Sequence, residues 1–128
     1  MLSFSVEIKP GLPVAEQILF SVKKAVVCGQ LRPGDKFPSI RQLSQDLRIN
    51  PNTAHKVISA LVDQGVLVTT PAIGSIVAER AVGDKRHKAE LLGAEMEKLV
   101  VEAKNLGLDL DDVNQSLAAH WKRLGKES

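Results

Sequence analysis

The chain has 128 residues, of which 44% are hydrophobic and 25% charged, and its net charge at pH 7 is +2. This length allows one modest core, and the single cysteine excludes an intrachain disulfide or a cysteine zinc site. No stretch approaches the roughly 18 apolar residues of a membrane span, and residues 1–10 lack the pattern of a signal peptide. We therefore expect no membrane partner and a reducing, cytoplasmic location.

The first predicted elements are an extended arm and a helix. Phe4, Val6 and Ile8 alternate with polar residues up to Pro10, which indicates a short extended segment. A helix is predicted from Pro13 to a stop at Gly29. The residues predicted on its buried side are Val14, Ile18, Leu19, Val22, Ala25 and Val26, and Cys28 is interpreted as a small core residue.

Two short amphipathic helices follow a turn at residues 32–35. Ser39, with Gln42 three residues later, matches a capping box, and Asn50 followed by Pro51 matches a second helix start. The apolar residues that repeat at helical spacing are Ile40, Leu43 and Leu47 in the first helix, and Ala54, Val57, Ile58, Leu61 and Val62 in the second. This pattern predicts a helix-turn-helix with a recognition helix over residues 51–64.

The polar residues of this segment are suited to contact with DNA. A recognition helix presents short hydrogen-bonding side chains at its N-terminal turns, because those turns enter the major groove. Asn52 and Thr53 meet this requirement, and Arg41 and Lys56 add positive charge for phosphates or guanine edges. The alternative for each residue is ordinary solvated surface.

The segment after Gly65 is predicted to be a β-hairpin, the wing, over residues 66–78. Val66, Val68 and Thr70 indicate one strand, residues 71–74 a turn, and residues 76–78 the returning strand. The wing carries no lysine or arginine, so we expect it to position the DNA more than to add affinity. Charge is distributed accordingly: residues 1–78 carry +3, from eight basic and five acidic residues, whereas residues 79–128 carry −1.

The last fifty residues are predicted to form a linker and two helices. Residues 79–88 are polar, and their Lys85–Lys88 run suits a solvated helix start better than a phosphate site. Gly107 ends the first helix, and Asp109 caps the second. The two apolar stripes contain Leu92, Met96, Leu99, Ala103 and Leu106, then Leu110, Val113, Leu117, Trp121 and Leu124.

Two helices of this size cannot bury such stripes alone, so they need a partner surface. The most economical partner is the same hairpin of a second subunit, and the alternative is that the helices pack on the winged domain. The residues predicted at the dimer interface are Leu92, Met96, Leu99, Ala103, Leu106, Val113, Leu117 and Trp121. The fold class is therefore mainly α with a small β-hairpin: a winged helix-turn-helix domain at 1–78 and a helical dimerisation and effector region at 79–128.

The run from Pro13 to Ala78 resembles the N-terminal domain of the GntR family of bacterial transcription regulators, and the YtrA-like subfamily in particular. The resemblance rests on a Gly-x-Leu-x-Pro-Gly turn at residues 29–34, Pro-Ser-x-Arg at residues 38–41, Asn-Thr in the recognition helix and a glycine in the wing. It implies a homodimeric repressor that binds a palindromic operator. The DNA-binding residues that it indicates are Ser39, Arg41, Gln42, Asn50, Asn52, Thr53, His55, Lys56, Gly74 and Ser75.

The chain departs from the family pattern at Pro51 and His55, where many members carry arginine, and in the wing, where residues 71–73 precede a single glycine instead of the usual two glycines and a basic or polar residue. A winged-helix module that binds proteins instead of DNA is therefore the alternative function. An enzyme is not expected, because no nucleophile–base pair, phosphate loop or paired-carboxylate motif is present. No cofactor or metal site is expected either, and the tail is too short to enclose an effector pocket alone, although a small-molecule effector between subunits stays open.

Overall fold

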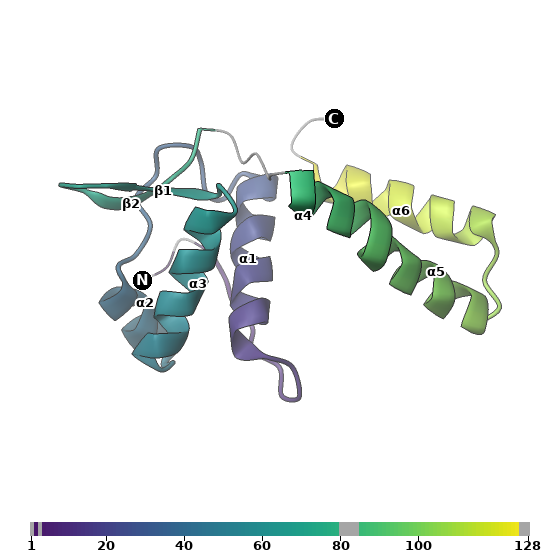
Figure 1. Ribbon diagram of the computed structural model, residues 1–128, viewed down its shortest axis with the longest axis horizontal. Coiled ribbons are helices and arrows are strands. Elements are labelled where there is room, and N and C mark those ends of the chain that lie inside the picture. The colour runs from purple at the N-terminus through teal and green to yellow at the C-terminus, as the bar shows by residue number, and fades with distance from the viewer. Residues whose placement is uncertain (1, 3, 80–84, 126–128) are drawn as a thin grey trace. The chain divides into compact units, whose positions relative to one another are not determined.

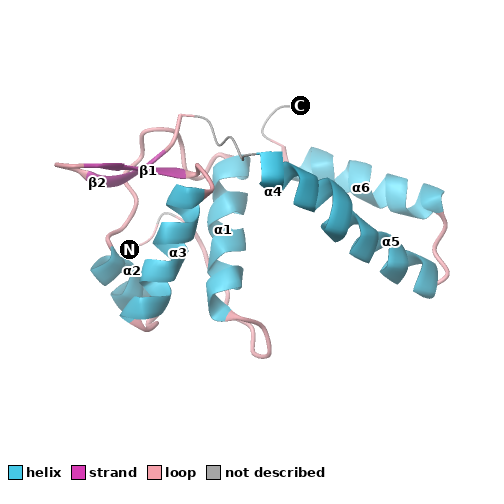
Figure 2. Ribbon diagram, in the orientation of Figure 1, coloured by secondary structure: helices cyan, strands magenta, loops and turns pink. Residues whose placement is uncertain are grey.

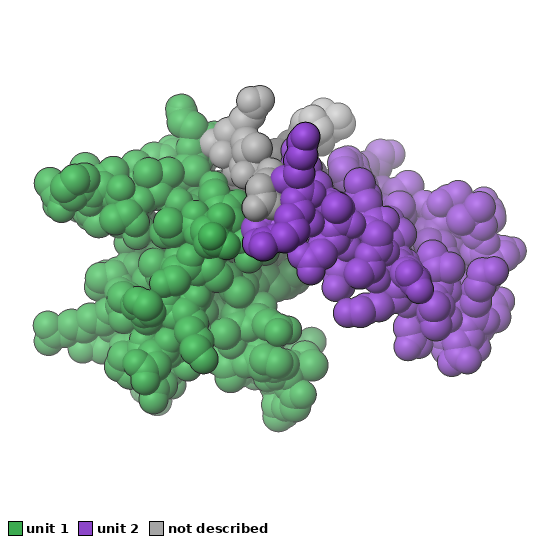
Figure 3. All heavy atoms as spheres, in the orientation of Figure 1, with its two compact units in different colours: residues 1–82 green, residues 83–128 purple. Residues whose placement is uncertain are grey.

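The computed structural model describes residues 2, 4–79 and 85–125, which form two compact units, residues 1–82 and residues 83–128 (Figure 3). The first unit contains α1 (Val14–Cys28), α2 (Ile40–Leu47), α3 (Pro51–Asp63), β1 (Leu67–Thr70) and β2 (Gly74–Val77). The second contains α4 (Lys85–Glu90), the π-helical turn η1 (Leu91–Glu95), α5 (Met96–Asn105) and α6 (Leu110–Leu124). Helices and a two-stranded sheet thus make up the described chain, as the predicted fold class requires (Figures 1 and 2).

The core of the first unit lies where α3 packs against both α1 and α2. Each helix contributes its apolar stripe, and α1 ends at Gly29 with a φ of 86°, a conformation that glycine adopts without strain. The buried residues are Phe4, Ile18, Val22, Ala25, Leu31, Phe37, Leu43, Ala54, Val57, Leu61, Val66, Leu67 and Val77. Cys28 is only half-buried, so it lies at the margin of this core and not inside it.

The N-terminal arm is anchored by Phe4, which is buried in the first unit. Val6 is half-buried and Ile8 is exposed, and neither residue belongs to a strand. The predicted alternation therefore yields an arm that packs on its own domain through its first aromatic residue.

The wing is an antiparallel pair in which Leu67 lies opposite Val77 and Thr70 opposite Gly74. The connecting loop is Pro71–Ala72–Ile73, and Gly74 has a φ of 97°. Strand β1 begins at Leu67, one residue later than the predicted strand, and Val66 and Leu67 are buried whereas Val68 is exposed. Val66 and Leu67, which lie between the end of α3 and the middle of β1, are therefore the residues that reach the core.

A third segment pairs with the wing, which the sequence pattern did not indicate. The amide of Phe37 donates a hydrogen bond to the carbonyl oxygen of Ser75 (2.9 Å). The amide of Gly34 donates to the carbonyl oxygen of Val77 (2.9 Å), and the amide of Val77 donates to the carbonyl oxygen of Asp35 (2.8 Å). Lys36 also forms a bridge with Ile76. The segment before α2 therefore ties the wing to the helix-turn-helix.

The second unit is a helical hairpin whose turn lies at residues 106–109. Gly107 has a φ of 80°, and Asp109 and Asp112 form a reciprocal capping box at the start of α6 (2.8 and 3.0 Å). The helical stretch already includes Lys85, within the segment that was predicted to be a linker. No helix among the described residues is both long and apolar enough to span a membrane.

Candidate nucleic-acid interface

The first predicted contact helix begins as its sequence indicates. The Ser39 hydroxyl accepts a hydrogen bond from the amide of Gln42 (3.1 Å), which is one of the two bonds of the predicted capping box. Arg41 lies in the first turn with its side chain exposed, because Leu43 and Ser44 take the inward positions. Ser39, Arg41 and Gln42 are therefore all accessible from solvent.

The recognition helix α3 is capped by Asn50, whose side-chain oxygen accepts a hydrogen bond from the amide of Asn52 (2.7 Å). Pro51 occupies the first helical position, where its missing N–H leaves no bond unmade. Ala54, Val57 and Leu61 are buried against the body. The opposite face of α3 is thereby presented to solvent.

Asn52, His55 and Ser59 share this exposed face. Successive residues of an α-helix are about 100° apart around its axis, which places Thr53 roughly 120° from the centre of the face. Thr53 is indeed half-buried, whereas the other three side chains are exposed. Thr53 thus lies at the margin of the face and not beside Asn52.

A groove of about 850 Å³ separates α3 from the wing and the start of α2. Five of the predicted contact residues line it, and they are Ser39, Gln42, His55, Gly74 and Ser75. Arg41, Asn50, Asn52, Thr53 and Lys56 do not line this groove, although all but Thr53 are exposed. The interface predicted from sequence therefore consists of a groove and of exposed residues outside it.

Four further polar residues line the groove and were missed by sequence reasoning: Lys36, Ser59, Asp63 and Thr69. Lys36 precedes Phe37 on the segment that pairs with the wing, and Ser59 and Asp63 follow His55 on α3. The helical spacing of four from His55 to Ser59 was the available signal for Ser59. Lys36 had no such signal, because its position depends on pairing with Ile76, forty residues away.

The positive charges of this surface are not neutralised within the described chain. Arg41 and Lys56 are exposed, and neither forms an ion pair with another described residue. Asp63 adds a negative charge in the groove near the end of α3. Cationic side chains are thus available to phosphates near the N-terminal ends of α2 and α3.

Most residues predicted at the dimer interface are exposed in the single chain. Leu92, Leu106 and Trp121 are 70%, 72% and 77% exposed, and Met96, Leu99 and Leu117 are also exposed. Ala103 is only 6% exposed and Val113 is half-buried, so Ala103 has almost no surface left to give to a partner. Ala103 lies close to the hairpin turn, where its carbonyl oxygen accepts a hydrogen bond from the amide of Leu108 (2.9 Å), and its place at the dimer interface stays a prediction.

The described residues contain no group of three or more histidine, cysteine, aspartate or glutamate side chains placed to hold a metal ion. The polar residues of the groove belong to amide, hydroxyl, imidazole, ammonium and carboxylate classes. Amide, hydroxyl and imidazole groups form hydrogen bonds with base edges, and an ammonium group binds phosphate, whereas the carboxylate of Asp63 repels phosphate.

Comparison with known proteins agrees with this geometry. Residues 14–77 match the bacterial regulatory proteins of the gntR family, which is half of the chain. The chain is 28% identical over 108 residues to the HTH-type transcriptional repressor YtrA of Bacillus subtilis, covering 84% of this chain and 83% of that protein. It is 29% identical over 106 residues to the uncharacterised HTH-type transcriptional regulator YhcF of the same organism, covering 83% and 84%.

Solved structures share the fold. A protein described as a transcriptional antiterminator from Listeria monocytogenes superposes with a TM-score of 0.83 at 26% identity, over 94% of this chain and 91% of that one. The DNA-binding domain of AraR, in complex with its operator ORX1, superposes with a TM-score of 0.52 at 26% identity, over 58% of this chain and 95% of that one. The match of residues 14–77, together with the capped helices and the wing, shows that the chain belongs to the GntR family and is a DNA-binding transcriptional regulator.

Proposed function

We propose that the protein is a homodimeric repressor that binds a palindromic operator. The observation that carries this proposal is the exposed polar face of α3, which lies beside a groove bounded by the start of α2 and the wing. A two-fold dimer would present this face twice, and an inverted repeat is the sequence that two such faces read.

The proposed DNA contacts divide by chemistry. Asn52 and His55 lie on the exposed face of α3 and read base edges, whereas Arg41 and Lys56 supply positive charge to phosphates. Ser39, Gln42, Asn50 and Thr53 flank these groups at the helix starts, and Gly74 and Ser75 bring the wing backbone to the duplex. The first domain, residues 1–78, would carry all of these contacts.

The proposed dimer interface lies on the second region, residues 79–128. Both of its helices carry large apolar side chains that are exposed in the single chain, among them Leu92, Leu117 and Trp121, and such a surface is typical of an interaction site. Pairing with the same hairpin of a second chain would bury them, with Trp121 and Met96 as anchors. An effector would bind between the paired subunits. The similarity to regulators of transcription supports a cytoplasmic location.

The repressor assignment is supported by the name of the B. subtilis relative, a transcriptional repressor. Selection of bound fragments from random genomic DNA tests the proposal. We expect the selected fragments to share an inverted repeat. Transcription from a defined template that carries this repeat should fall when the protein is added. Fragments that contain only one half-site would contradict the proposed dimer. Increased transcription would contradict the proposed repression.

A further inference from the structure

The turn between α2 and α3 holds an arginine in a left-handed backbone conformation. Arg48 has φ and ψ of 55° and 50°, and its amide and that of Ile49 both donate to the carbonyl oxygen of Ser44. It is the only residue other than glycine with a positive φ in the described chain. Such a conformation brings Cβ close to the following carbonyl oxygen, so glycine adopts it without the strain that arginine meets.

The fold itself gives no use for the Arg48 side chain. The turn uses backbone amide groups, which glycine would also supply. The side chain is exposed, and it forms no ion pair with another described residue. A strained residue whose side chain neither packs nor pairs within the chain points to a role outside it.

The position of Arg48 indicates what that role is. Arg48 lies two residues before Asn50, which caps α3. Pro51, the first residue of α3, has neither an N–H group nor a charge that could bind a phosphate. In a helix-turn-helix protein the first helix crosses the DNA backbone and the second enters the major groove by its N-terminus, so the turn between them lies against phosphates. Residues 51–58 of α3 carry only one formal positive charge, on Lys56.

We propose that Arg48 is a phosphate-binding residue that anchors the N-terminal end of α3 on the duplex. The guanidinium group offers paired N–H donors that match two phosphate oxygens. This contact would supply charge at the end of α3 where Pro51 offers none. The inference rests on the family's DNA-binding function and not on the dimer or the operator sequence.

The test compares three variants of the full chain: Arg48→Gly, Arg48→Lys and, as a control, Lys24→Ala. Lys24 is exposed on α1, on the side away from α3, so its loss removes the same charge from a different surface. Binding to a random-sequence duplex of about three helical turns is followed by fluorescence anisotropy between about 50 and 200 mM salt. Thermal melting of each variant is recorded in parallel.

We expect Arg48→Gly to weaken binding about tenfold at low salt and to reduce the slope of log affinity against log salt by about 0.9 for each bound subunit. Its Tm should equal or exceed that of the wild type, because the left-handed conformation suits glycine. Arg48→Lys should keep the slope, since the positive charge is retained. Lys24→Ala should leave the slope unchanged.

A wild-type salt slope for Arg48→Gly would overturn the proposal, as would an equal loss of slope in Lys24→Ala. A lower Tm would show instead that the arginine side chain stabilises the fold. Arg48→Asn removes the charge while asparagine still tolerates the left-handed conformation, so it repeats the test if the glycine variant folds poorly. A wild-type slope in that variant would also rule the contact out.

Discussion

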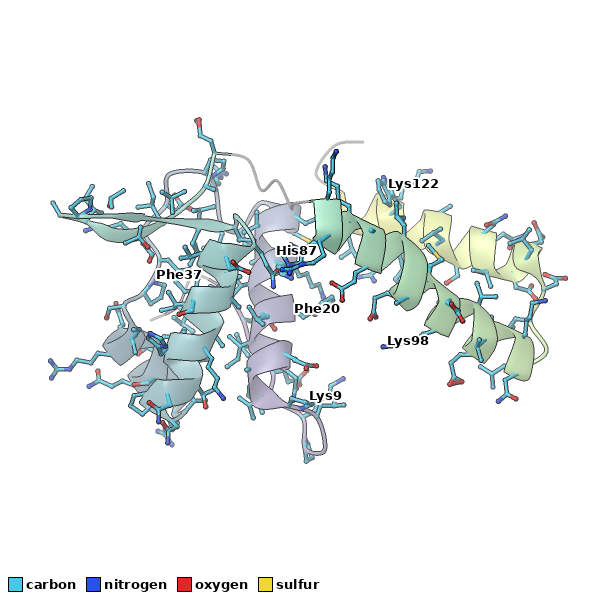
Figure 4. All side chains as sticks on the ribbon, in the orientation of Figure 1. Lys9, Phe20, Phe37, His87, Lys98 and Lys122 are labelled. Carbon is cyan, nitrogen blue, oxygen red and sulfur yellow. The ribbon has the colours of Figure 1, made fainter. Side chains whose placement is uncertain are left out.

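The aromatic rings of Phe4 and Phe37 stack with their centroids 5.8 Å apart and their planes inclined by 11°. Phe4 belongs to the N-terminal arm, and Phe37 belongs to the segment that joins the wing to α2, beside α3 in Figure 4. The arm is thereby fixed to the segment that positions Ser39 and the groove. The first few residues of the chain thus contribute to the shape of the DNA-binding surface.

Replacement of Phe4 by alanine should lower the free energy of unfolding of the first unit by about 3 kcal/mol, because a buried ring is removed and its stacking is lost. Urea denaturation followed by circular dichroism measures this change. The matched control is Phe20→Ala: Phe20 is 64% exposed and points from α1 on the side opposite α3 (Figure 4). An equal loss of unfolding free energy in both variants would show that stacking of Phe4 on Phe37 does not stabilise the domain.

Arg41→Ala should weaken DNA binding and reduce its salt dependence, because the exposed guanidinium near the start of α2 would lose its phosphate contact. The slope of log affinity against log salt is expected to fall by about 0.9 for each subunit. Electrophoretic mobility shifts at several salt concentrations measure it. An unchanged slope would remove Arg41 from the phosphate contacts.

Asn52→Ala should relax base preference more than it lowers overall affinity. Asn52 lies on the exposed face of α3, and an amide side chain that pairs with a base discriminates by about 1–3 kcal/mol against the wrong one. The comparison variant is Thr53→Ala, which we expect to change base preference less because Thr53 is half-buried at the margin of that face. Selection of binding sites from random DNA reports both effects, and a larger change in the Thr53 variant would contradict the assigned face.

Leu117→Glu combined with Trp121→Ala should convert the proposed dimer into a monomer. Both side chains are exposed in the single chain, and a carboxylate in a paired apolar surface would be costly to desolvate. Light scattering of the full-length protein gives the mass. Val68→Glu, an equally exposed apolar position in the wing, should leave the mass unchanged. A dimer that survives the double change would place the interface elsewhere.

Local signals in the sequence predicted where the helices of the candidate interface begin. Ser39 and Asn50 cap their helices as their positions indicate, since a cap depends only on the next two or three residues. The inward faces of α1, α2 and α3 also follow from spacing, except at Val62 of α3, which was predicted on the apolar stripe and is 37% exposed. The resemblance to the GntR family, which covers these same elements, is confirmed by the family match over residues 14–77.

Features that depend on distant parts of the chain were not predictable. Pairing of Lys36 with Ile76 joins segments forty residues apart, and it determines which residues line the groove. The burial of Ala103 depends on how the second hairpin closes, which the apolar spacing does not show. The left-handed conformation of Arg48 is a local feature, but it was not predictable either, because arginine is uncommon at positions with a positive φ.

Hydroxyl-radical footprinting of the protein on a fragment selected from genomic DNA distinguishes a dimer on an inverted repeat from a single bound subunit. We expect two protected backbone patches, related by a two-fold axis and about 34 Å apart along one face of the duplex. The monomeric Leu117→Glu, Trp121→Ala variant should protect one patch, and only at higher concentration. A single patch with the wild-type protein, or protection that does not follow the inverted repeat, would contradict the proposed dimer.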